Sequence, residues 1–232
     1  MFPATFFSQL PSLTLWAMGI LSANAASIGS PSLNALEINP IAIQQQDRIA
    51  LQIRQTTWDA EAFLLGRDEA DLLNRLKPDS WCVAECLDHL TQTTRAFLPA
   101  ISEAIAKAPK LTGTRRLRTG IFPSLFIRSL SPPYRIRFRV LPQLAPQRLS
   151  PEQAWNQFVE SQSELLATLN SAAGFAIDRV TIKSPVYARI SYNIYGVFRM
   201  LAAHQSRHVW QIAQILKTLD SHRTPASPKQ AA

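Results

Sequence analysis

Two long stretches of this chain place apolar residues three and four positions apart, and this spacing limits its fold more than any other feature. The first stretch runs from Trp81 to about Lys107, and the second from about Ser191 to Leu219. Such spacing gathers apolar side chains on one face of a helix, which must be buried against other elements. Because the 232 residues include only 7 glycines, the composition also favours helices over sheets.

Two further long helices are predicted from their ends. One runs from Ile41 to Gly66, and residues 67–76 follow it as a short helical turn. The other begins at Ser150 with a proline in its first turn and stops at Gly174. Ser80 is the predicted N-cap of the helix that begins near Trp81. The sequence therefore predicts an all-α fold, a four-helix bundle with a long basic crossover between helices 2 and 3.

The crossover carries most of the charge of the chain. The net charge is +8, and ten lysine and arginine residues lie between Glu103 and Glu152, where there is no acidic residue. Five prolines exclude one continuous helix, although a short amphipathic turn is expected near residues 121–130. Alternation in residues 134–140 predicts an extended piece with its arginines on one side. Two interpretations stay open: a surface that recruits an anionic partner, or a solvated loop.

The chain divides into three predicted segments: a leader at residues 1–40, the bundle at 41–220 and a disordered polar tail at 221–232. The leader contains a short apolar run followed by small residues that resemble a signal-peptide cleavage site, but no lysine or arginine precedes Arg48. A signal peptide, an unstructured leader and an overextended start all remain open. Since a basic n-region is missing, we expect a cytoplasmic location. The apolar run is too short and too interrupted to span a membrane.

Three histidines lie within the two patterned helices and form a candidate metal site. His204 and His208 are four residues apart, so they project from one helix face, and His89 lies on another helix. Imidazoles on an apolar face are costly unless their nitrogens are satisfied. A metal would satisfy them together and keep one open position, as in catalytic sites. The alternative is that each ring donates a hydrogen bond to a core acceptor. His222 is expected in the solvated tail.

Residues near these histidines have further candidate roles. Glu85 lies one turn before His89 and is a weak catalytic candidate, either orienting that imidazole or relaying a proton. The alternative for Glu85 is a first-turn carboxylate stabilised by the helix dipole. Cys86 is a reserve metal ligand or a packing residue, and Gln211 could point inward beside His208. Arg199 and Arg207 are expected on the far side of this helix.

Two segments resemble a known family. Trp81-Cys-Val-Ala-Glu-Cys-Leu-Asp-His-Leu90 resembles the segment that opens the second helix of DinB-like proteins, and Ala203-His-Gln-Ser-Arg-His-Val-Trp-Gln-Ile212 resembles their paired-histidine segment. The similarity spans roughly residues 41–219. The resemblance implies a four-helix bundle with a three-histidine metal site at His89, His204 and His208. It also implies a metal-dependent hydrolase, or a transferase that uses a low-molecular-weight thiol.

Three hypotheses for the function follow. Two of them are enzymatic and one is not, so the sequence leaves open whether the chain is an enzyme. The first is a metal-dependent hydrolase that uses metal-activated water on an unknown small molecule. The second is transfer of a small thiol at the same metal, and the third is a non-catalytic metal-binding or ligand-binding bundle. The expected cofactor is a divalent metal, with zinc, nickel and iron all compatible with imidazole ligands. The expected partners are a small-molecule substrate of anionic character and a second copy of the chain. Nucleic acid is not expected, because no groove-reading module is recognisable.

Overall fold

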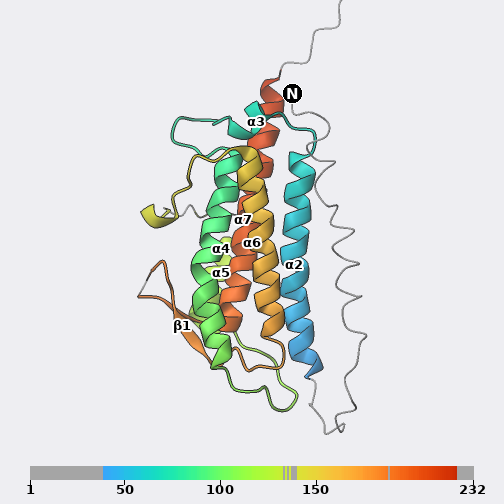
Figure 1. Cartoon of the computed structure of the whole chain (residues 1–232), viewed down its shortest axis with the longest axis vertical. Coiled ribbons are helices and arrows are strands. Elements are labelled where there is room, and N and C mark those ends of the chain that lie inside the picture. Colours follow the sequence, from blue (N-terminus) through green and yellow to red (C-terminus); the bar gives the residue numbers. More distant parts are fainter. Residues whose placement is uncertain (1–38, 133, 135, 137–139, 188, 224–232) are drawn as a thin grey trace, which may run out of the picture.

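The computed structural model describes residues 39–132, 134, 136, 140–187 and 189–223 (Figure 1). Its four long helices are α2 (Pro40–Leu64), α4 (Val83–Ala106), α6 (Pro151–Ser171) and α7 (Ile194–His222). In the bundle α4 packs against α6 and α7, and α2 packs against the same two helices. Each long helix therefore packs against two of the other three, and α2 and α4 occupy diagonally opposite corners of the bundle. The predicted all-α bundle is confirmed.

Side-chain caps explain where two of these helices begin. The Oδ1 atom of Asn39 accepts a hydrogen bond from the backbone N–H of Ala42 at the start of α2. Ser150 and Gln153 form a capping box at the start of α6, each side chain accepting from the backbone of the other. Capping of this kind satisfies N–H groups that have no partner within the helix. The predicted start of the helix at Ser150 is confirmed.

The predicted cap of the second long helix is wrong by two residues. Cys82 is the N-cap of α4, and Glu85 accepts a hydrogen bond from its backbone N–H over 3.0 Å. The hydroxyl of Ser80 instead bonds the backbone of Lys77. Serine stabilises a tight turn by the same hydrogen bonds that it uses in a cap, so the sequence pattern alone did not separate the two roles.

A small hairpin precedes the last helix, and its second strand occupies residues that were predicted to begin that helix. Strands β1 (Thr181–Lys183) and β2 (Ser191–Asn193) pair antiparallel, with Ile182 opposite Tyr192. The fourth helix therefore begins at Ile194, where Asn193 caps it, and not at Ser191. Strands of three residues are too short to show the alternation by which strands are recognised in a sequence.

The crossover contains helix α5 (Ile121–Leu130) and the 3-10 turn η1 (Pro142–Leu144). The predicted amphipathic turn is thus a helix, and it packs along α7. Because α5 covers this side of α7, Arg199 and Arg207 are partly buried and not on a free outer face. Arg199 donates a hydrogen bond to the hydroxyl of Thr119 over 2.5 Å. Most of the predicted extended piece, at residues 135 and 137–139, lies outside the described residues.

The buried core consists of two apolar clusters with a polar layer between them. The lower cluster contains Phe97, Leu165 and Leu201, and the upper cluster contains Leu87 and Phe158. Each long helix contributes buried polar side chains between its parts of the two clusters. These residues are Thr56 and Thr57 of α2, Thr91, Thr93 and Thr94 of α4, Ser161 and Gln162 of α6, and Gln205 and His208 of α7.

The described structure also contains the short helix α3 and the last residues of α7. The short helix α3 (Glu69–Leu73) follows α2 in the chain, packs against α4 and α6, and confirms the predicted helical turn. Within the described residues, no helix is both long enough and apolar enough to span a bilayer. Residues 1–38 and 224–232, which hold most of the predicted leader and tail, lie outside the described residues. His222 is exposed at the last position of α7.

Candidate metal centre

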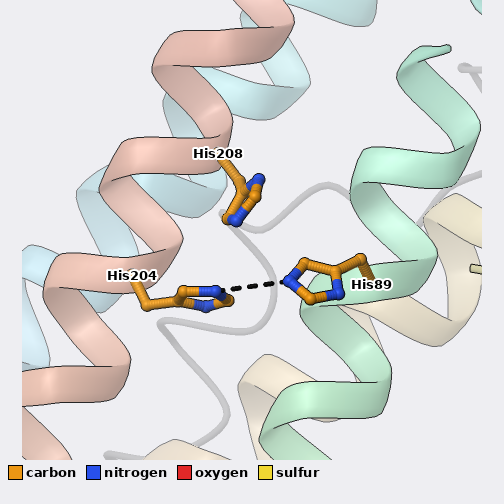
Figure 2. Close-up of side chains that lie close together, drawn as sticks. All are labelled: His89, His204 and His208. Carbon is orange, nitrogen blue, oxygen red and sulfur yellow. Dashed lines mark hydrogen bonds between the residues drawn. The ribbon is translucent and has the colours of Figure 1, made fainter. Parts of the chain in front are cut away.

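The three histidines predicted as ligands come together between two helices. Figure 2 shows His89, carried by α4, facing His204 and His208 on α7. One ring nitrogen of each histidine lies within 4.8 Å of the others. No cysteine, aspartate or glutamate of the described residues belongs to this cluster.

The distance between two of the ring nitrogens fits binding of both to the same metal ion. The Nε2 atoms of His89 and His204 are 3.3 Å apart (Figure 2). Two nitrogens bound to one tetrahedral zinc at about 2.0–2.1 Å lie about 3.3–3.4 Å from each other. The two nitrogens therefore need little movement to share a metal.

Hydrogen bonds fix which nitrogens of two rings are available. The Nδ1 atom of His89 donates to the carbonyl oxygen of Leu144 over 2.9 Å. The Nδ1 atom of His208 donates to Oε1 of Gln211 over 3.1 Å. In a neutral imidazole the other nitrogen is then an acceptor, so both Nε2 atoms carry a lone pair. Such a partner on the second nitrogen is typical of metal-ligating histidines.

His204 completes the group with a different environment. Its Nδ1 atom is buried and has no hydrogen-bond partner among the described residues. Its Nε2 atom is the nitrogen that faces His89. Each neutral ring offers one nitrogen lone pair, so the three rings can supply three nitrogen donors to a cation.

Burial keeps these three imidazoles neutral. It lowers the pKa of His89 and His204, and it lowers the pKa of His208 to about 3. Repulsion among the rings and the positive charge of Arg207 lower the pKa of His204 and His208 further. Since metals bind the neutral ring, the site is in its binding form at neutral pH without losing protons.

Two residues that the sequence did not single out support the site. The ring of Trp81 packs against His89 and His208, with centroid distances of 4.8 and 5.9 Å. The Oδ2 atom of Asp88 accepts hydrogen bonds from the backbone N–H of Gln147 and from Gln92, both over 2.6 Å. Asp88 thereby holds the crossover, including the Leu144 carbonyl, against α4. The position of Trp81 and Asp88 inside the histidine segment was the only sequence signal for either.

Of the three weaker candidates, Glu85 and Cys86 lie outside the histidine cluster, and Gln211 bonds one of its rings. Glu85 caps α4 through Oε2, and its Oε1 atom pairs with Arg75, so both oxygens are occupied away from the imidazoles. This position is the first-turn alternative stated above. Cys86 is fully buried in the upper cluster, where desolvation raises the pKa of its thiol, and it packs as an apolar residue. Gln211 points inward to His208 as predicted.

Comparisons with known proteins agree with the fold and the histidine motifs. The model of the DinB superfamily matches residues 52–212, a range that includes His89, His204 and His208. The chain belongs to the DinB superfamily. Comparisons with curated proteins and with solved structures gave no match.

Proposed function

We propose that this protein is a metal-dependent hydrolase that binds one divalent metal ion through His89, His204 and His208 and acts on a small anionic molecule. The observation that carries the proposal is the 3.3 Å separation of the His89 and His204 Nε2 atoms inside a cluster of neutral rings. Three protein nitrogens with a fourth position open are the arrangement of catalytic zinc sites.

A divalent metal in a site of neutral ligands keeps its full charge, and it supplies Lewis acidity that lowers the pKa of a water molecule or thiol beside it. The chain itself would have two roles around that metal. Leu144 and Gln211 orient two of the rings through their hydrogen bonds. Trp81 covers one side of the rings with an apolar surface and keeps water away from it.

The charge near the site supports an anionic substrate. Arg207 lies close enough for its charge to lower the pKa of His204 and of His208. The crossover that borders the site through Leu144 carries no acidic residue. A positive field of this kind favours the approach of anions. Metal identity, the homodimer and the cytoplasmic location stay predictions.

Metal analysis of the purified chain tests the site. The wild-type protein is expected to retain one zinc, nickel or iron ion per chain, and a His204→Ala, His208→Ala double variant is expected to retain none. His222→Ala, which changes an exposed histidine of the same helix, is the matched control. Equal metal content in the wild-type protein and the double variant would contradict the proposal.

Activity is tested separately on the metal-loaded protein. Carboxylate-bearing esters and amides are supplied with and without a small thiol, and with an electrophile in a third arm. Turnover without thiol that disappears in the double variant supports a hydrolase. Turnover of the electrophile that requires thiol supports thiol transfer instead, and metal binding without turnover supports the non-catalytic bundle.

A further inference from the structure

The outer face of α5 exposes aliphatic side chains to solvent. Ile121, Ser124, Leu125 and Arg128 recur at three- and four-residue spacing and are all exposed, whereas the opposite face is buried in the lower cluster. Ile121 is 79% exposed, the highest value among the large hydrophobic residues that the structure describes, and Leu125 is 60% exposed. Ile121 and Leu125 therefore form an apolar strip on α5 that the bundle does not cover.

Positive charge without compensation lies on and beside this strip. Arg128 continues the strip at its end, and Arg116 and Arg118 are exposed in the segment that leads into α5. Among the described residues, no ion pair includes any of these three arginines. No acidic residue occurs anywhere between Glu103 and Glu152. The surface thus combines exposed aliphatic groups with an unbalanced positive field.

We propose that α5 docks on the surface of an anionic phospholipid bilayer. Ile121 and Leu125 enter the interface, while Arg116, Arg118 and Arg128 contact the lipid headgroups. Helices with an apolar strip beside basic residues bind in this way, and anionic lipid contributes to the binding at each basic side chain. With 10 residues, α5 is too short to cross a bilayer and would lie on it.

The charge and the side-chain types decide among occupants. A second copy of the chain on this face would bring like charges together. A nucleic acid would engage the arginines but leave the two aliphatic side chains in water. An anionic bilayer accepts both kinds of side chain at once.

Co-sedimentation of the full chain with vesicles tests the proposal. The vesicles contain phosphatidylcholine alone, or equal amounts of phosphatidylcholine and phosphatidylserine. We expect strong binding only to the vesicles with phosphatidylserine, decreasing with added salt. An Arg118→Ser, Arg128→Ser variant is expected to bind about 25-fold more weakly, at about fivefold for each arginine. An Ile121→Ser, Leu125→Ser variant is expected to bind at least about tenfold more weakly.

Matched controls change the same residue types elsewhere. Arg48→Ser, Arg54→Ser and Leu51→Ser, Leu65→Ser alter exposed residues at or beside α2, and both are expected to bind vesicles like the wild-type protein. Vesicle binding that survives both α5 variants, or no binding by the wild-type chain, would overturn the proposal. Heparin binding is measured as well. If the Arg118→Ser, Arg128→Ser variant loses heparin affinity while the Ile121→Ser, Leu125→Ser variant binds vesicles like the wild-type protein, the surface binds polyanions in general, and the proposal is also overturned.

Discussion

The Nδ1 atom of His89 lies 2.9 Å from the carbonyl oxygen of Leu144, so a residue of the crossover sets the orientation of a ring on α4. The two residues are 55 positions apart in the chain. The crossover is therefore part of the candidate metal centre, and substitutions that weaken its packing against α4 should lower the affinity for a metal.

Asp88→Ala is expected to weaken metal binding without removing a ligand. The variant removes the carboxylate that accepts from the Gln147 N–H and so releases the crossover from α4. Loss of such supporting contacts lowers metal affinity by about 10- to 100-fold. Competition with a chelator measures the affinity, and Asp47→Ala, at an exposed position of α2, is the control. Unchanged affinity in Asp88→Ala would mean that the Leu144 carbonyl does not depend on this anchor.

The metal-free protein should lose stability as the pH falls below about 6.5. An unfolded chain binds a proton on each histidine near that pH, whereas burial lowers the folded pKa of His208 to about 3. Between these values the unfolded state holds more protons, so the free energy of unfolding decreases with falling pH. The effect of His208 alone is on the order of a few kcal/mol.

Urea unfolding at a series of pH values checks this expectation. His208→Gln should flatten the dependence between about pH 6.5 and 3, since it removes the buried titrating ring. His222→Gln should leave the dependence unchanged, because His222 is exposed at the end of α7. Identical pH profiles for the wild-type protein and His208→Gln would rule out this cause.

Glu85→Gln should separate a structural role of this residue from a catalytic one. Glutamine can still accept the hydrogen bond from the Cys82 N–H, but it cannot form the ion pair with Arg75. We expect a loss of about 1 kcal/mol in the free energy of unfolding, with metal content and turnover retained. Glu85→Ala should be less stable still, because the cap is also lost. A large loss of turnover at retained stability in Glu85→Gln would instead assign the residue to catalysis.

Trp81 should report metal binding by its fluorescence. Its ring packs against His89 and His208, so a quenching ion such as copper(II) in the site would lie beside it. Titration with copper(II) should quench the wild-type protein strongly and a Trp81→Phe variant much less, although four other tryptophans remain. Trp210→Phe, which changes an exposed tryptophan of α7, is the control. Equal quenching in all three proteins would place the ion elsewhere.

The long helices and the histidine cluster were predictable because both depend on spacing along the chain. Apolar periodicity located α4 and α7 within a few residues, and signals at the helix ends located α2 and α6. Four-residue spacing put His204 and His208 on one face. The convergence of His89 on that pair rested on the resemblance as well as on periodicity, since pairing between distant helices leaves no trace in local spacing.

The contacts around the cluster were not predictable for the same reason. The carbonyl of Leu144 is a backbone group, so the residue type at position 144 does not indicate that it orients His89. The burial of Arg199 and Arg207 depends on α5 folding back along α7, which the periodicity of α7 does not encode. Glu85 fitted both a catalytic and a capping role, and only the contacts of its two oxygens distinguish them.

The polar layer between the two apolar clusters also fixes the vertical register of the bundle. Sliding one long helix by a turn, about 5.4 Å, would bring its threonines or glutamines against leucine and phenylalanine of a neighbouring helix. A shift of α7 would also break the hydrogen bonds that link Gln205 to Thr94 of α4 and Ser206 to Thr56 of α2, so a shifted alignment is disfavoured even where apolar faces would still meet. The alignment that remains is the one in which α4 brings His89 level with His204 and His208.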